Sequence, residues 1–166
     1  MADSTVGSGG TYSDLSTWEA ATDNDLVSTT TIERALLLNQ TFTLTAGLVV
    51  SGATTNSSYY REITTDAGAS FVDNANVRTN ALTFNTANGA AITSTTAYVQ
   101  PLVLLDEGYA RLTKLQIRTT ASTSYAVRIG ANTQVTQCII DCNGVVYGGL
   151  ELTNSGAVAT NTLVIK

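Results

Sequence analysis

Two adjacent acidic residues, Asp106 and Glu107, are the strongest candidates for chemistry in this sequence. Glycoside hydrolases hold a pair of carboxylates about 5–9.5 Å apart, and polysaccharide lyases also use clustered acids. Here the pair stands directly before Gly108, which indicates a turn. Because adjacent side chains on a turn usually diverge, the sequence predicts a solvated acidic loop, with glycan cleavage as the alternative.

The chain contains no histidine. This excludes a Ser-His-Asp or Cys-His hydrolase and a His-ligated zinc site. The two cysteines, Cys138 and Cys142, are separated by about 13 Å on an extended strand, whereas a disulfide needs Cα atoms within about 7 Å. Both are therefore predicted to be free thiols, as expected in a reducing cytoplasm. We expect no metal and no cofactor.

Two pairs of opposite charge recur at one spacing. Arg118 and Asp141 are 23 positions apart, and so are Arg128 and Glu151. If segments at this spacing stack as neighbouring strands about 4.8 Å apart, each arginine lies over a carboxylate. The sequence therefore predicts structural cross-strand ion pairs rather than catalytic acids at these positions.

The segment from Ser57 to Arg61 is the richest in residues that serve recognition. Tyrosine and arginine are enriched in the hot spots of protein interfaces. The candidate interface residues are Tyr59, Tyr60, Arg61 and Trp18. The alternative is a structural role, in which a tyrosine packs at the start of a strand before Ile63 and Arg61 pairs with Glu62 or Asp66.

Short strands must position these residues. From about residue 29, apolar pieces of four to six residues recur between Gly, Asn, Asp, Thr and Ser, a pattern typical of strands. Examples are residues 41–45, 48–50, 81–84 and 135–140. None of these pieces shows a helical period.

The strands repeat at a nearly constant spacing. An offset of 23 residues brings five apolar positions onto five others: Leu112 onto Val135, Leu115 onto Cys138, Ile117 onto Ile140, Val127 onto Leu150 and Ile129 onto Leu152. Offsets of 23 to 25 extend the pattern: Ile92 to Leu115, Val103 to Val127, Leu105 to Ile129, Cys138 to Leu163 and Ile140 to Ile165. This period without helices predicts an all-β parallel β-helix of about six 23-residue coils.

Two other folds remain as alternatives. A leucine-rich repeat shares the period, but only Leu112, Leu115 and Ile117 resemble its L-x-x-L-x-L pattern. A β-sandwich explains the alternation of apolar and polar residues but predicts no 23-residue register.

One short helix is predicted, over residues 14–22. Ser13 is a suitable N-cap, Asp14 favours the positive end of the helix dipole, and Leu15 and Trp18 share one face. Residues 1–28 are therefore expected to form a turn and a capping helix, and residues 29–166 the β-helix. Because residues 163–165 lie in a predicted strand without a polar cap, the stack is expected to abut another subunit or to continue past Lys166.

The composition excludes further classes. Charged residues make up 13 % of the 166 residues, the net charge is −5, and Thr, Ser, Asn and Gly number 29, 13, 12 and 13. A nucleic-acid partner is not expected for an acidic chain. The first residues have no secretory signal pattern, and no apolar run approaches the roughly 20 residues that span a bilayer, so no membrane partner is expected either.

With these features in view, the chain resembles right-handed parallel β-helix proteins and, more narrowly, bacteriophage structural proteins. The resemblance is carried by residues 6–13 with Leu15 and 18–20, and by residues 67–74, 88–92 and 115–117. It implies a virion component, either a capsid decoration protein or a tail fibre or spike. It carries over no functional residue.

The expected function is that of a non-enzymatic decoration or cement protein, made in the host cytoplasm and located in the virion. It would bind the major capsid protein or other virion proteins and form a homotrimer. A head location is favoured because the predicted capping helix begins within a dozen residues of Met1. The alternatives are a tail fibre or spike that binds or cleaves host glycan, and a bacterial surface adhesin.

Overall fold

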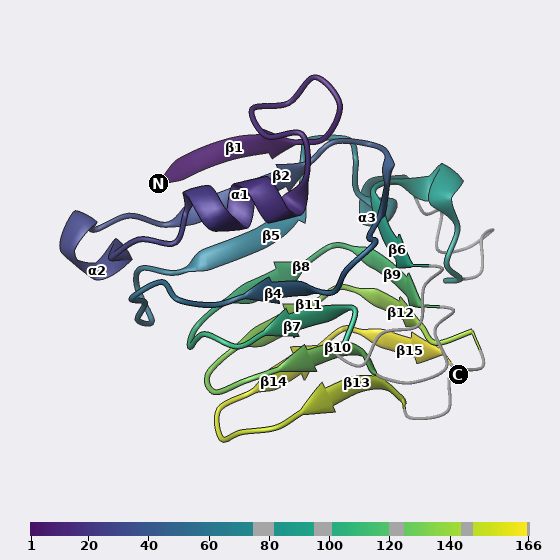
Figure 1. Cartoon of the computed structure of the whole chain (residues 1–166). Coiled ribbons are helices and arrows are strands. Elements are labelled where there is room, and N and C mark those ends of the chain that lie inside the picture. Colours follow the sequence, from purple (N-terminus) through teal and green to yellow (C-terminus); the bar gives the residue numbers. More distant parts are fainter. Residues whose placement is uncertain (75–81, 95–100, 120–124, 144–147, 166) are drawn as a thin grey trace.

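The computed structural model describes residues 1–74, 82–94, 101–119, 125–143 and 148–165, and these residues form three parallel β-sheets (Figure 1). The six-strand sheet contains, in spatial order, β1 (Ala2–Val6), β2 (Glu33–Leu37), β5 (Arg61–Thr65), β8 (Arg111–Thr113), β11 (Gln134–Thr136) and β14 (Val158–Thr160). The four-strand sheet contains β4 (Leu48–Val50), β7 (Val103–Leu105), β10 (Tyr125–Ile129) and β13 (Gly148–Leu152). The five-strand sheet contains β3 (Thr41–Thr43), β6 (Ala91–Ser94), β9 (Gln116–Thr119), β12 (Ile139–Asp141) and β15 (Leu163–Ile165).

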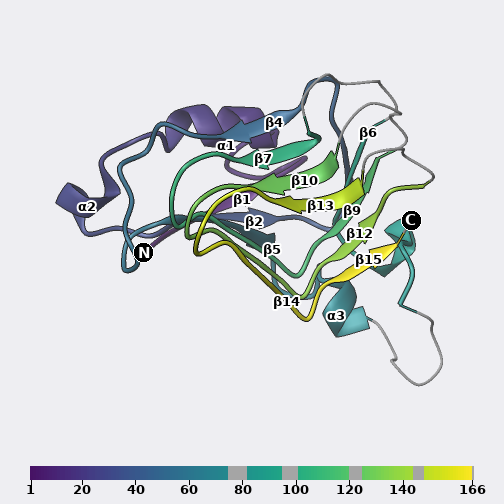
Figure 2. The ribbon, with the colours of Figure 1, turned by 90° about the horizontal axis from the view of Figure 1, so that it is seen from below.

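From β2 onward the chain visits the six-strand, five-strand and four-strand sheets in turn. Apart from the β1–β2 pair, each pairing therefore joins two strands that are three strands apart along the chain, and all pairings are parallel. Seen from below, the strands of each sheet lie over one another along three sides of a common interior (Figure 2). Long-range parallel pairing of this kind gives each sheet a continuous backbone hydrogen-bond ladder.

The predicted right-handed parallel β-helix of about 23-residue coils is wrong. The described residues form three parallel sheets of four to six strands aligned across the molecule, not a single helical solenoid. The spacing is also not uniform, since Phe42 pairs with Ile92, Ile63 with Leu112 and Leu48 with Val103. These offsets of 49 to 55 residues arise because the long connections at residues 51–60 and 66–90 separate strands that stack directly.

The predicted register is confirmed in the later strands. Leu112 pairs with Val135, Ile117 with Ile140 and Val127 with Leu150. It slips elsewhere, because Ile140 pairs with Val164 rather than with Ile165 and Ile92 pairs with Ile117 rather than with Leu115. A slip of one residue matters in a strand, since it moves a side chain to the opposite face of the sheet.

The hydrophobic core lies between the three sheets. Its side chains form columns across paired strands, such as Leu105–Ile129 and Ile117–Ile140, and all four of these residues are fully buried. Inward and outward positions alternate along each strand. The core therefore follows directly from the pairing of apolar residues at equivalent strand positions.

The predicted helix is confirmed as α1 (Leu15–Ala21), with Leu15 and Trp18 fully buried against the interior. Its N-cap is Asp14 rather than Ser13, and Asp14 Oδ1 accepts a hydrogen bond from the Thr17 backbone N–H at 2.8 Å. Residues 2–6, expected to be part of a terminal turn, instead form β1 beside β2.

Short helices that the sequence did not predict are α2 (Leu26–Thr29), α3 (Phe71–Asn74) and the 3-10 helix η1 (Thr86–Asn88). Phe71 and Phe84, from the described parts of the connection after β5, pack against Ala91 and Ile139 on the outer face of the five-strand sheet. A strand was predicted over residues 81–84, but residues 82–84, the part that the structure describes, do not form one. Phe84 serves instead as a buried anchor on the sheet.

Candidate functional site

The candidate site lies beneath α1 and is centred on Arg61, the first residue of β5. Because side chains two apart share a strand face, Arg61 points to the same side as the buried Ile63 and enters the interior. Arg61 is only 1 % exposed. A buried guanidinium must find partners for its donors, and those partners come from three other segments of the chain.

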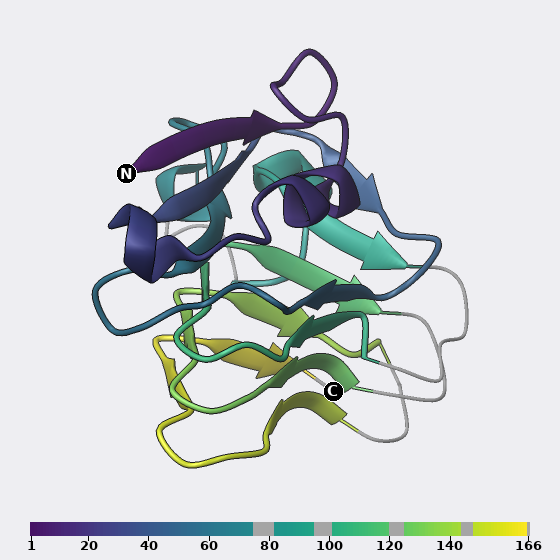
Figure 3. The same ribbon diagram turned by 60° about the vertical axis from the view of Figure 1, so that its left-hand side comes forward.

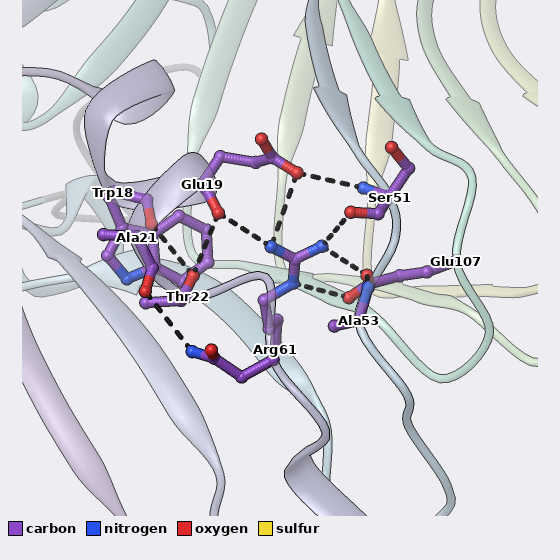
Figure 4. A network of polar contacts seen from close by, with 9 residues as sticks. Trp18, Glu19, Ala21, Thr22, Ser51, Ala53, Arg61 and Glu107 are labelled. Atoms are coloured by element: carbon purple, nitrogen blue, oxygen red, sulfur yellow. Dashed lines mark hydrogen bonds and ion pairs between the residues drawn. The ribbon is translucent and has the colours of Figure 1, made fainter.

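The guanidinium is held on every side (Figure 4). Its Nε donates to Glu107 Oε1 at 2.8 Å, and its Nη2 donates to Glu107 Oε2 and, at 2.7 Å, to the Ser51 carbonyl oxygen. Its Nη1 donates to the Glu19 carbonyl oxygen at 3.1 Å and lies 3.4 Å from Glu19 Oε1. This is a bidentate pair with one carboxylate, the strongest geometry available to arginine.

The surrounding acids are also engaged with backbone groups. Glu107 Oε2 accepts from the Ala53 N–H, and Glu19 Oε1 accepts from the Ser51 N–H, each at 3.2 Å. The Glu107 side chain is 3 % exposed and that of Arg61 is fully buried. We call Arg61, Glu107, Glu19 and the Ser51 backbone the cap lock, because they join α1 to the six-strand and four-strand sheets.

The cap lock corrects two sequence predictions. Asp106 is exposed, but Glu107 is buried and paired, so the acidic pair is not a solvated loop. Arg61 and Trp18 are buried and cannot be the interface residues that the sequence suggested. Arg61 pairs neither with Glu62 nor with Asp66. Its true partner is 46 positions away, and no local pattern points to it.

The other two suggested interface residues are half-buried. Tyr59 lies in a turn in which its backbone N–H donates to Asn56 Oδ1 at 2.9 Å. The Tyr60 hydroxyl accepts from Arg111 Nη1 at 2.6 Å, and the guanidinium of Arg111 stands 3.5 Å from the Tyr60 ring centroid. Tyr60 thus belongs to a cation–π contact within the chain.

The predicted cross-strand ion pairs are present. Arg118 donates through Nε and Nη2 to Asp141 Oδ2, at 2.8 and 2.6 Å, and Arg128 Nε lies 2.6 Å from Glu151 Oε2. Arg118 also stacks 4.1 Å from the Phe84 ring centroid. These pairs join neighbouring strands at equivalent positions, as the 23-residue spacing predicts.

A further charge ladder crosses the outer face of the six-strand sheet. Asp3, Arg34, Glu62 and Arg111 occupy paired positions with alternating sign. Arg34 donates to both carboxylate oxygens of Asp3, and this hydrogen bonding lowers the pKa of Asp3 below its ordinary value. The sequence offered no sign of this ladder, because its strands are separated by 28 to 49 residues.

Both cysteine thiols are enclosed. Cys138 and Cys142 are buried free thiols, as predicted, and burial raises the pKa of Cys138 to about 12. A hollow of about 340 Å³ beside the start of α1 is lined by residues 43–46, Ser16 and Asp14, whose carboxylate caps the helix. Within the described ranges, no cluster of three His, Cys, Asp or Glu side chains could hold a metal ion.

The described chain has no helix with the length and apolar character needed to cross a membrane. Comparison with known proteins found no matching family model, no matching curated protein and no matching solved structure. The function must therefore be argued from the site itself.

Proposed function

We propose that this protein is a non-enzymatic structural component of a bacteriophage particle, and that it acts as a decoration or cement protein on the head. The observation that carries the proposal is the cap lock. Glu107 belongs to the acidic pair that was the strongest catalytic candidate in the sequence, and Arg61 donates hydrogen bonds to both of its carboxylate oxygens. It fastens a helix and two sheets together instead of facing a substrate.

The charged groups support the same view. Each arginine among the described residues contacts an acid or a tyrosine of the chain itself; these are Arg34, Arg61, Arg111, Arg118 and Arg128. Such groups set strand register and rigidity. A rigid body of this kind suits a protein that reinforces a shell.

The side faces are the surfaces that we assign to contact with the major capsid protein or its neighbours. They carry hydroxyl groups in rows, as in the 3.2 Å contacts between Thr43 and Thr93 and between Thr136 and Thr160. Rows of short hydroxyl side chains can donate and accept hydrogen bonds with little loss of side-chain entropy. We assign the protein to a phage particle because its sequence resembles phage structural proteins.

The alternative, a glycan-cleaving tail protein, would need an accessible carboxylate pair. Asp106 is exposed, but its neighbour is locked under α1. We therefore assign no catalytic role to the pair. The variant Asp106→Asn tests this assignment directly, since Asp106 is exposed and lies outside the cap lock. Polysaccharide depolymerisation that is lost in this variant while it remains folded would contradict the assignment.

The proposal is tested by titrating purified protein onto undecorated heads of the phage that encodes it. Co-sedimentation should saturate at a fixed number of copies per head. Heat-treated protein serves as the control for non-specific sedimentation. Binding that never saturates, or no binding, would overturn the proposal.

A further inference from the structure

Three of the five tyrosines in the described part of the chain gather along one edge of the molecule. The connections from the four-strand sheet to the six-strand sheet are stacked one below another along this edge (Figure 3). Tyr59 and Tyr60 end the connection to β5, and Tyr109 lies in the connection to β8. A hydrogen bond from Thr55 Oγ1 to the Gly108 carbonyl oxygen joins these two connections. We call the half-buried residues Tyr59, Tyr60, Tyr109 and Arg111 the tyrosine patch.

Tyr109 has a backbone conformation that a bulky side chain rarely adopts. Its φ of 63° lies in the left-handed region, which glycine and asparagine tolerate best. By the register of β8, β11 and β14, the equivalent positions on the next two strands are held by Asn132 and Gly156, with φ of 56° and 78°. The turn therefore does not require a tyrosine. Strained residues of this kind persist where a function uses their side chains.

Arg111 supplies the charge of the tyrosine patch. Its guanidinium carbon lies 3.5 Å from the Tyr60 ring centroid, and its Nη1 donates to the Tyr60 hydroxyl. The other arginines of the described chain all form ion pairs, whereas Arg111 has none with any described carboxylate. Its Nε and Nη2 are therefore left to bind a carboxylate from outside the chain, in the bidentate geometry that Arg34 uses with Asp3.

We propose that the tyrosine patch is the surface by which this protein docks on the head, with Arg111 binding a carboxylate of the major capsid protein. This inference rests on the proposed function and names the contact that it needs. Tyrosine and arginine dominate the energetics of protein interfaces, because they bury a large area and also form hydrogen bonds. The tyrosine rings beside Arg111 exclude water from the ion pair and so strengthen it.

The chain itself supplies the test variants. Tyr109→Asn introduces the residue type of the equivalent Asn132, and Arg111→Gln that of Gln134, with which Arg111 pairs. Both variants should fold. The urea midpoint of Tyr109→Asn should not fall below that of the wild type, because asparagine suits a left-handed backbone. Each variant should nevertheless weaken binding to undecorated heads by at least about tenfold in co-sedimentation.

Two control variants match these changes outside the tyrosine patch. Arg128→Gln removes an equal charge from the four-strand sheet, and Gln137→Asn places asparagine at another left-handed position, with φ of 54°. Neither control should change head binding. Salt provides a readout that a purely structural role would not move. Wild-type binding should weaken as the salt concentration rises, and Arg111→Gln should show a smaller dependence on salt.

Wild-type protein that binds heads no better than folded Tyr109→Asn and Arg111→Gln would overturn this inference and leave the proposed function standing. Wild-type protein that does not bind heads would overturn both. Equal losses in Arg128→Gln would also overturn the inference, as would an acidic host glycan whose binding both patch variants lose while head binding is unchanged.

Circular dichroism must show that each variant is folded. If a patch variant unfolds, nitration of tyrosines in the wild-type protein decides the question. Tyr59, Tyr60 and Tyr109 should react more slowly on decorated heads than in the free protein, because the interface encloses them. Equal nitration of the three residues in the free and bound protein would overturn the inference.

Discussion

Replacing Arg61 by methionine should destabilise the protein strongly. Methionine retains much of the apolar stem, so the change removes mainly the guanidinium. Glu107 would then keep the Ala53 N–H as its one remaining donor within the described contacts, while its side chain is only 3 % exposed. Removing one partner of a buried ion pair costs about 3–5 kcal/mol, because the other charge is left uncompensated.

Urea unfolding followed by circular dichroism measures this cost as a change in the free energy of unfolding. The matched control is Arg34→Met, since Arg34 pairs with Asp3 at the surface, where the side chains are 27 % and 38 % exposed. An exposed pair contributes only about 0–1 kcal/mol. Equal costs for the two variants would refute a structural role for the cap lock.

A double-mutant cycle separates the pair from its surroundings. Glu107→Gln alone leaves Arg61 buried beside Glu19 and two carbonyl groups, and should also destabilise the protein. The double variant Arg61→Met/Glu107→Gln removes both charges, so its cost should fall short of the sum of the single costs by about 1.5–3 kcal/mol. Additive costs would show that the two side chains do not act as a pair.

Three further results are expected. Ile140→Ala should cost about 2–5 kcal/mol in urea unfolding because it opens a cavity in a buried column, whereas Thr136→Ala on the outer face should be near neutral; equal costs would contradict the assignment of faces. The hydrogen bond from Thr17 lowers the pKa of Asp14 below 3.8, so the stabilisation by this cap is complete above that pH and is lost as the pH falls through the folded-state pKa. Asp14→Ala should therefore cost about 1 kcal/mol at neutral pH and nothing in strong acid, and a cost that persists in acid would contradict the cap. Cys138, whose pKa burial raises to about 12, should resist alkylation at mildly alkaline pH until the protein is unfolded, and rapid native labelling would contradict its burial.

The sequence was most informative where connections are short. From β8 onward the strand spacing is nearly constant, so apolar residues and the Arg118–Asp141 and Arg128–Glu151 pairs align at one offset. Earlier in the chain the segments at 51–60 and 66–90 interrupt the spacing. The register there depends on contacts between distant segments, which no sliding comparison detects.

The cap lock lay outside what the sequence could indicate. Arg61 and Glu107 look like exposed charges when each is considered with its neighbours, because charged residues are seldom fully buried. Their burial depends on α1 closing over the interior and on two sheets converging beneath it. Only the three-dimensional arrangement brings Glu19, Ser51 and Glu107 around one guanidinium.

The most direct test of the central claim, that this protein reinforces a phage head as a rigid body, is an electron cryomicroscopy map of undecorated heads after incubation with the purified chain. We predict added density of three-sided bodies, repeated with the symmetry of the shell and lying against the major capsid protein. Bare heads, or added density confined to the tail, would contradict the claim.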